Sequence, residues 1–418
     1  MRGGVLGLLA VAASWGVFWG GWAALIPDLK ADLGLDTRAL GLSLFAVPLA
    51  AVPAMALTGR LADRFAQHTL PLVTTLFAAG IGVVAFAGSV PVFVAGLLLV
   101  GAASGAIEVA LNATAAAHEA RDGVRLFNKV HAATPLAMVL AGPSVGLARQ
   151  LGVSRTAVLL MVAAVVLASA ALAVDRRGWR DANTPAEHDT GAGHGTEAEH
   201  RTGAGHDTEG PASRPVNAYG RESVRWMRPF LLVGAVAAVV LLMENAVEQW
   251  GAVHLEQNLG AGPLLGSAGP AAYMAGLSAG RMLAQWKGAL LADHTLVRLG
   301  AAVGGLGLAL GAVATSPYLT LAGFAFAGIG LAPVVPTLLA AVGRAVGPRD
   351  RSTAISVVIT TGYAGFLASP PLVGLLAAGI GLPSALGVVA GLGLGVLLGA
   401  QGLRLLPDHH PAEDHLPS

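Results

Sequence analysis

The chain has 418 residues, of which 55% are hydrophobic and only 12% are charged, whereas a soluble globular protein would be about a quarter charged. Such a chain cannot cover its folded surface for water, which excludes an ordinary soluble protein and predicts helices that cross a membrane. The absence of cysteine excludes disulfides and thiolate chemistry, and the net charge of +1 gives no reason to expect a nucleic-acid partner.

Hydropathy, punctuated by Pro, Gly and charged residues, predicts twelve membrane-spanning helices. In the first half of the chain they cover residues 5–26, 39–58, 70–89, 91–117, 127–148 and 154–175. In the second half they cover residues 229–255, 264–287, 295–316, 318–341, 352–377 and 382–404. We therefore expect an all-α polytopic membrane protein with two pseudo-symmetric six-helix halves, residues 1–175 and 226–405, followed by a cytoplasmic tail at 406–418.

The placement of Lys and Arg predicts the orientation, because short cytoplasmic loops carry an excess of these residues. If the N-terminus is inside, the outer loops contain only Lys30, Arg38, Arg149 and Arg155, all in the first half. No outer loop of the second half contains either residue type. We therefore expect a multi-pass protein of the cell inner (cytoplasmic) membrane with both termini cytoplasmic.

Residues 176–225, between the two halves, are polar and rich in Gly, Thr, Glu and His, which is typical of a disordered cytoplasmic linker. Four histidines recur there every six residues: His188, His194, His200 and His206. Flexible imidazoles can capture zinc or nickel weakly or sense pH near neutrality. A slipped duplication is the favoured interpretation, because six-residue spacing fits no compact metal site. We therefore expect no metal site and no cofactor.

A short polar stretch, Gly59 to His68, separates the second and third predicted helices and contains Asp63 and Arg64. Gly lets two backbones approach closely and Asp can cap a helix N-terminus, so the stretch predicts a tight cytoplasmic turn. An ordinary positively charged inner loop is the alternative. A partial counterpart, Gly280-Arg281, lies near the end of the eighth predicted helix, with Ala284 at the position equivalent to Asp63. Such parallel repeats are expected of transporters built from two related halves.

Four charged residues lie away from the ends of the predicted helices, where a charge costs at least about 3 kcal/mol unless it faces a cavity or a partner. They are Glu108, Glu244, Glu248 and Arg281. Asn112 lies one turn after Glu108 on the same helix face. Glu108 could carry a coupling proton or accept hydrogen bonds from a polar substrate. A carboxylate satisfied by structural partners is the alternative.

On the seventh predicted helix, Glu244, Asn245, Glu248 and Gln249 form two i,i+4 pairs on adjacent faces. We expect this polar stripe to line a central cavity. Glu244 is the stronger candidate for proton coupling, because Glu248 could instead sit at the outer mouth. Arg281 on the eighth helix could attract an anionic substrate, and snorkelling to the cytoplasmic interface is equally compatible with its position.

Three tryptophans on the first predicted helix, Trp15, Trp19 and Trp22, share one face at i, i+4 and i+7. Trp22 is close enough to the end of the helix to belong to an interfacial belt, whereas Trp15 and Trp19 are too deep for one. In a cavity, the two deep indoles could stack on a sugar or an aromatic substrate. Packing between helices is the alternative.

The stretch Gly59–His68 resembles the signature loop between the second and third helices of the major facilitator superfamily of transporters. Further motifs are similar to the fucose-permease-like branch of bacterial inner-membrane facilitators: Trp22–Pro27, Glu108 with Asn112, His131–Ala133, Glu244 with Trp250–Val253, Gly280-Arg281, and Gly362–Leu367 with Pro370-Pro371. The resemblance implies alternating access driven by the proton gradient, with Glu108 matching an acid of that branch. It also implies a conformational gate at Gly59, Asp63 and Arg64, which would latch the cytoplasmic side between helices two and eleven.

Two departures from this branch bear on the substrate. The proton-coupled sugar importers of the branch carry an acid on the first helix, and this chain has none there, which disfavours sugar uptake. The stretch Gly142–Gly146 resembles part of the fifth-helix motif of proton-coupled drug exporters and adds Gly142 and Pro143 to the predicted gate. We therefore expect a proton-coupled secondary transporter that exports a small organic molecule by alternating access.

Two alternative functions are compatible with these features: a proton-coupled importer of a sugar or related solute, and a non-transporting membrane sensor or scaffold. An enzyme is not expected, because no loop is long enough to build a soluble active site. The sequence contains no phosphate-binding loop of the Walker type, so it does not indicate ATP-driven transport. The expected partners are a small-molecule substrate, protons and the lipid bilayer, and the chain is expected to be a monomer.

Overall fold

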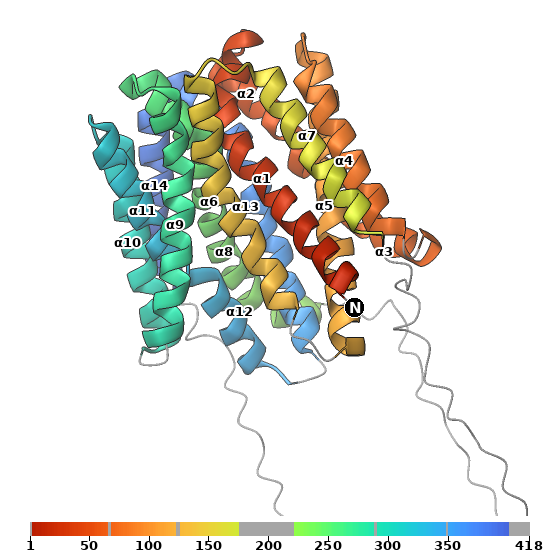
Figure 1. The fold of residues 1–418 in the computed structure, drawn as a ribbon. Helices are drawn as coiled ribbons and strands as arrows, with labels where there is room; N and C mark the ends of the chain where they lie inside the picture. The colour runs from red at the N-terminus through yellow and green to blue at the C-terminus, as the bar shows by residue number, and fades with distance from the viewer. Residues whose placement is uncertain are drawn as a thin grey trace, which may run out of the picture.

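The computed structural model describes residues 2–65, 68–122, 126–174, 221–287, 291–347 and 350–400, and every regular element in these ranges is a helix (Figure 1). The helices of the first half are α1 (Arg2–Asp32), α2 (Thr37–Leu44), α3 (Ala46–Phe65), α4 (Thr69–Ala85), α5 (Val90–Asp122), α6 (Phe127–Gln150) and α7 (Arg155–Leu172). Those of the second half are α8 (Arg221–Val253), η3 (His254–Asn258), α9 (Pro263–Lys287), α10 (Asp293–Val313), α11 (Pro317–Leu331), α12 (Val334–Ala345), α13 (Arg351–Ile380) and α14 (Leu382–Gly399).

Ten stretches of the described chain are long and apolar enough to cross a membrane. The apolar helix α4 is shorter, with 17 residues, and α9 falls outside this set. With these two helices the structure accounts for the twelve predicted crossings. The predicted all-α polytopic membrane fold is therefore confirmed.

Proline divides two of the crossings into helix pairs. In the second crossing, α2 and α3 meet at Phe45, because Pro48 has no N–H to donate to the carbonyl of Leu44. In the tenth, α11 and α12 meet at Ala332 and Pro333, since a proline in a helix removes one backbone hydrogen bond. The upper part of the second crossing, α2, can therefore follow a different direction from α3.

Several helices run beyond the ends that hydropathy predicts, because a helix satisfies its own backbone and can continue past the apolar layer. The first ends at Asp32 rather than at residue 26. The prediction of a turn that begins at Gly59 is wrong, since α3 continues in helical conformation to Phe65. The side chains of Asp63 and Arg64 lie outside the described residues, so their role as a latch stays a prediction.

The predicted linker at 176–225 falls outside the described residues as far as residue 220. The histidine repeat lies within that part, so its interpretation stays a prediction. The last residues of the predicted linker, from Arg221 onward, belong to α8.

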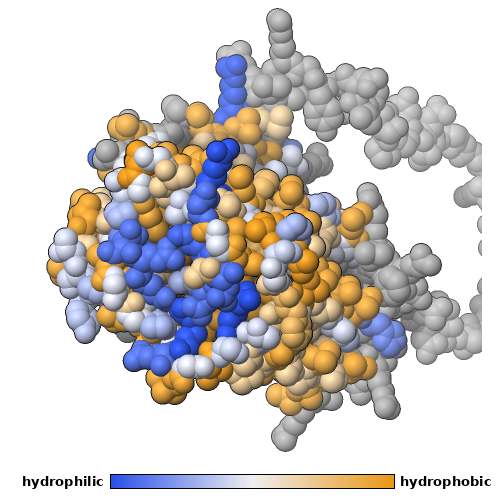
Figure 2. All heavy atoms as spheres, turned by 90° about the horizontal axis from the view of Figure 1, so that it is seen from above, coloured by the Kyte–Doolittle hydropathy of each residue, from blue (hydrophilic) through white to orange (hydrophobic). Residues whose placement is uncertain are grey.

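The two halves touch at one end of the bundle and separate toward the other. We call the first the α2 end, which holds α2 and η3, and the second the α12 end, which holds α12 and the start of α1 (Figure 1). α6 packs along α9 and α13 packs along α2, whereas α13 barely touches α3. Figure 2 views the α2 end and shows hydrophilic side chains across its middle with hydrophobic ones around them. The halves are therefore closed against each other at the α2 end.

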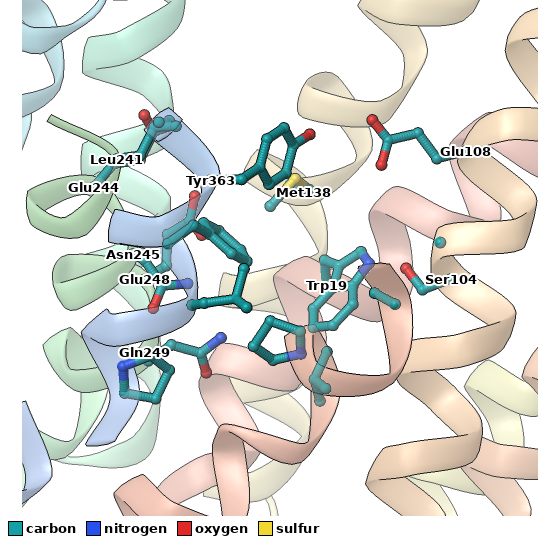
Figure 3. Close-up of a pocket in the computed structure, with 18 of the residues that line it drawn as sticks. Trp19, Ser104, Glu108, Met138, Leu241, Glu244, Asn245, Glu248, Gln249 and Tyr363 are labelled. Carbon is teal, nitrogen blue, oxygen red and sulfur yellow. The ribbon is translucent and has the colours of Figure 1, made fainter. Parts of the chain in front are cut away.

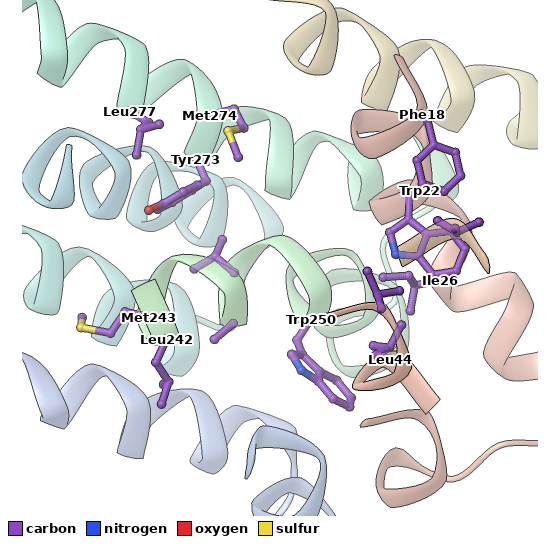
Figure 4. Close-up of a cluster of buried hydrophobic side chains, with 14 of the residues drawn as sticks. Phe18, Trp22, Ile26, Leu44, Leu242, Met243, Trp250, Tyr273, Met274 and Leu277 are labelled. Atoms are coloured by element: carbon purple, nitrogen blue, oxygen red, sulfur yellow. The ribbon is translucent and has the colours of Figure 1, made fainter. Parts of the chain in front are cut away.

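Apolar side chains of both halves belong to one buried cluster (Figure 4). Trp22 is only 2% exposed and stacks on Phe18 and Phe93, with ring centroids 5.8 Å and 6.3 Å apart. In the second half, Trp250 and Tyr273 are fully buried. Burial of Trp22 against these rings argues against the interfacial belt considered from its position in the sequence, because a belt side chain would face the membrane surface.

Candidate substrate cavity

A cavity of about 520 Å³ lies between the two halves, which is within the size range of small-molecule sites. Its wall on the side of the first half comes from α1, α2, α3, α5 and α6. The second half contributes α8, α9, α12 and α13. A solute in this cavity would contact both halves at once. A movement of one half against the other could then change the side of the membrane to which the solute is exposed.

The wall of the first half presents two indoles and a carboxyl group. Trp15 donates its Nε1–H to Ser104 Oγ at 2.9 Å, which holds its ring against α5. Trp19 packs edge-on against Phe18 at 5.0 Å, so that this neighbour orients its ring. Glu108 lies on α5, one turn after Ser104, and Figure 3 shows both side chains on the same side of the cavity. The helix thus places a carboxyl group deep in the protein on a rigid support.

The opposite wall carries the polar stripe of α8. Glu244, Asn245, Glu248 and Gln249 all line the cavity (Figure 3). Asn245 is only 1% exposed, and its Oδ1 has no hydrogen-bond partner among the described residues. Gln249 Oε1 accepts the indole Nε1–H of Trp22 at 3.3 Å, a hydrogen bond between the halves. The stripe therefore offers hydrogen-bond acceptors to a bound molecule.

The carboxyl groups of Glu108, Glu244 and Glu248 share a further property. No described residue donates a hydrogen bond to any of them. Each of the three residues is half-buried, and a carboxyl group that loses hydration without gaining a donor is destabilised. These three side chains are therefore suited to bind a proton or a ligand.

Two of the predicted cavity residues lie elsewhere. Asn112 is half-buried and Arg281 is exposed, and neither belongs to the cavity wall. Arg281 is near enough to Glu244 to interact with it electrostatically. Its exposure agrees with the alternative of snorkelling, in which the stem lies along apolar surface and the guanidinium reaches water.

A buried ion-pair cluster at the α2 end joins the halves and was not predicted. Arg149 of α6 donates from Nε to Asp28 Oδ2 at 2.7 Å and pairs with Asp28 a second time through Nη2. Its Nη1 and Nη2 donate to Glu256 Oε1 and Oε2 of η3 at 2.7 Å and 3.0 Å. Nη1 also donates to the carbonyl of Ala24 at 2.6 Å. We call Arg149, Asp28 and Glu256 the clamp.

The signal for the clamp in the sequence is weak. Arg149 is one of the few basic residues of the predicted outer loops, but 121 residues separate it from Asp28 and 107 from Glu256. No local spacing rule connects positions so far apart. Only the packing of α1 and α6 against the end of α8 brings them together.

Glycines allow the close approach of the halves at the α2 end. A Cβ on Gly146 would lie 1.9 Å from Ser267 Oγ and 2.7 Å from the carbonyl oxygen of Pro263 on α9. A Cβ on Gly41 of α2 would lie 2.4 Å from the carbonyl oxygen of Pro370 on α13. Gly142, which the sequence places in the gate, has more room, since its nearest neighbours would be 3.4 Å away.

A cavity enclosed by two six-helix halves, whose described residues meet mainly at one end, is the architecture of a membrane transporter. The chain belongs to the Major Facilitator Superfamily, whose family profile matches residues 5–298 and 249–418. This confirms the superfamily predicted from the sequence, and the finer resemblance to the fucose-permease-like branch stays a prediction. The chain is thus a multi-pass membrane transporter.

Relatives and solved structures agree with this assignment. The chain is 25% identical over 384 residues to an uncharacterized MFS-type transporter of Yersinia pestis, covering 91% of each chain. It is 22% identical over 387 residues to the membrane protein MosC of Rhizobium meliloti, covering 91% of this chain and 85% of the relative. Its fold is similar to the nucleoside transporter NupG, with a TM-score of 0.74 at 12% identity over 96% of this chain and 98% of that one.

A second solved structure with this fold is a bacterial homologue of the human lysosomal transporter Spinster in an inward-facing, unoccupied conformation. The TM-score is 0.64 at 15% identity, over 96% of this chain and 92% of that one. At such identities the likeness shows the fold alone.

Proposed function

We propose that the protein is a proton-coupled secondary transporter that exports a small organic molecule by alternating access. The observation that carries the proposal is the set of half-buried carboxyl groups without donors on opposite walls of the cavity, Glu108 on one side and Glu244 with Glu248 on the other. A carboxyl group that takes up and releases a proton can couple the proton gradient to the movement of the halves. Glu108 and Glu244 are the coupling candidates.

The clamp supports the alternating-access part of the proposal. It ties α1 and α6 of the first half to η3 of the second, whereas α3 and α13 barely touch. If both termini are cytoplasmic, the α2 end faces outward and the cavity is accessible from the cytoplasm. In the other state the clamp would break, and the predicted latch at Gly59, Asp63 and Arg64 would close the cytoplasmic side.

Export is favoured over import by two features of the sequence: the first helix has no acid in its apolar stretch, and Gly142–Gly146 resembles part of an exporter motif. Exchange of the solute for protons also suits this cavity, because its carboxyl groups can bind either a proton or part of the solute. The inner membrane of a bacterial cell is the proposed location.

The test begins with a ligand screen. Purified protein is examined by thermal shift against sugars, amino acids and aromatic antibiotics, and the solute that stabilises it most is taken into proteoliposomes. Proton exchange predicts accumulation when the lumen is acidic, whereas proton symport predicts accumulation when the outside is acidic. The sign of the pH gradient therefore separates the exporter from an importer, whichever way the protein is inserted.

Neutral variants identify the coupling residue. Glu108→Gln or Glu244→Gln should abolish accumulation driven by the gradient while solute exchange without a gradient continues. Glu119→Gln is the matched control, because Glu119 is on the same helix as Glu108 but outside the cavity wall. Normal accumulation by both cavity variants would contradict the mechanism. If none of the solutes that stabilise the protein is transported, the result would favour a sensor or scaffold.

A further inference from the structure

The acidic side chains of the cavity wall have no basic counterpart among the described residues that line it. They are Glu108, Glu244 and Glu248, and the described wall contains no Lys, Arg or His. Glu244 and Glu248 are one helical turn apart, and like charges at this spacing repel each other. A positive group between the walls would remove this repulsion and supply the missing donors.

The basic groups nearby lie outside this wall. Arg281 interacts electrostatically with Glu244 but is exposed and lies outside the wall. Arg149 is 9% exposed and is occupied by two carboxylates, Asp28 and Glu256, so the clamp contributes no free positive charge. An anionic solute would therefore meet carboxyl groups without a compensating cation among the described residues of the wall.

The rest of the wall is apolar and aromatic. Trp15 and Trp19 face the cavity from α1, and Tyr363 and Phe366 line it from α13. Aromatic faces attract cations through their ring quadrupole and also bury apolar groups. Three methionines add adaptable, polarizable surface: Met55, Met138 and Met274.

A sugar fits this wall less well than a cation does. A sugar needs both donors and acceptors around its ring. The two side-chain amides of the wall, Asn245 and Gln249, can supply both, but its three carboxyl groups supply only acceptors when ionised. The buried Asn245 Oδ1 lacks a donor, as do the carboxyl groups. The wall as a whole is complementary to a molecule that has hydrogen-bond donors or a positive charge together with an apolar body.

We propose that the transported solute is an organic cation, an amine or quaternary ammonium with an aromatic or branched apolar body, bound between Glu108 on one wall and Glu244 with Glu248 on the other. This rests on the proposed transport function and adds the chemical class of the solute. The same carboxyl groups would hold a proton when the cation is absent, so that one cation leaves as protons enter.

The test measures equilibrium binding to the purified full chain with probes of fixed charge. Tetraphenylphosphonium and tetraphenylborate have the same shape and opposite charge. Phenyltrimethylammonium and tert-butylbenzene form a smaller pair, one cationic and one neutral. We expect saturable binding of at least one of the two cations, at least about tenfold tighter than its partner, since tenfold corresponds to one modest charge interaction.

Variants then locate the site. Glu248→Gln should weaken binding of the cation at least about tenfold, and Glu119→Gln should leave it unchanged. If Glu248→Gln fails to fold, Glu244→Gln serves as the second variant, and the comparison of paired probes on the unmodified protein needs no variant. Tighter binding of tetraphenylborate or tert-butylbenzene, or no saturable binding of either cation, would overturn the proposal. Because binding needs no gradient, this failure is distinct from a failure of proton-coupled transport.

Discussion

Arg149 of the first half and Glu256 of the second half form a two-point ion pair at the α2 end, with Nη1–Oε1 and Nη2–Oε2 distances of 2.7 Å and 3.0 Å. The Arg149 side chain is 4% exposed and that of Glu256 is 12% exposed. A buried charge that loses its partner is costly, by about 2–5 kcal/mol in comparable pairs. The pair is therefore well placed to hold the halves together in this state.

Breaking this pair should shift the protein toward the state that is open at the α2 end. Glu256→Gln leaves Arg149 with one carboxylate, and we expect at least a tenfold rise in the open population, from a cost of about 2 kcal/mol. The chain has no cysteine, so Met138→Cys in the cavity wall provides a single reactive site. Its labelling by a membrane-impermeant maleimide added on the side of the membrane that the α2 end faces reports the open state.

A surface ion pair provides the control for this experiment. Arg344 and Asp293 pair within the second half with side chains 61% and 41% exposed, and such exposed pairs contribute little. Asp293→Asn should therefore leave labelling unchanged. Unchanged labelling in Glu256→Gln would show that the clamp does not hold the closed state.

The second prediction concerns the contact between α6 and α9. Gly146→Ala should favour the state open at the α2 end by about 1–3 kcal/mol, because its Cβ would collide with Ser267 and the backbone of Pro263. Gly142→Ala on the same helix should have little effect, since its Cβ finds ordinary contact distances. The same cysteine labelling measures both variants. Equal behaviour of the two would contradict the role given to this contact.

The third prediction concerns the aromatic wall. Trp19→Ala should weaken binding of tetraphenylphosphonium by about 2- to 30-fold, the range of a cation–π contact. Trp286→Ala is the control, because Trp286 is 78% exposed and is not part of the cavity wall. Titration of the purified variants with the labelled cation gives both affinities. Affinities that change equally in both variants would point to nonspecific partitioning of the probe.

The fourth prediction concerns the linker. Deletion of residues 185–212, which removes all four repeated histidines, should leave the rate of solute transport unchanged, because the halves are joined through their own interface at the α2 end. Transport assays in proteoliposomes with and without added zinc measure this. A slower rate, or an effect of zinc that the deletion removes, would assign the histidines a role in transport.

Local pattern predicted which polar side chains of α8 line the cavity. Glu244, Asn245, Glu248 and Gln249 share one side of a helix because four residues make about one turn, and an apolar helix in a membrane protein turns its polar side inward. Asn112 shows the limit of the same reasoning. It lies one turn from Glu108, yet it is not part of the wall, since the rotation and crossing of the helix decide where the wall ends.

The sequence by itself determined the membrane class and the candidate acids, because composition, hydropathy and helical spacing are local properties, and its motifs carried the resemblance to the superfamily. Only the tertiary structure decided that Trp22 is a buried contact between the halves, that Arg281 is exposed outside the cavity wall, and that Gly146 is the tight glycine of α6. It also brought Arg149 to Asp28 and Glu256. Contacts across more than a hundred residues depend on how whole helices pack, which no short stretch of sequence encodes.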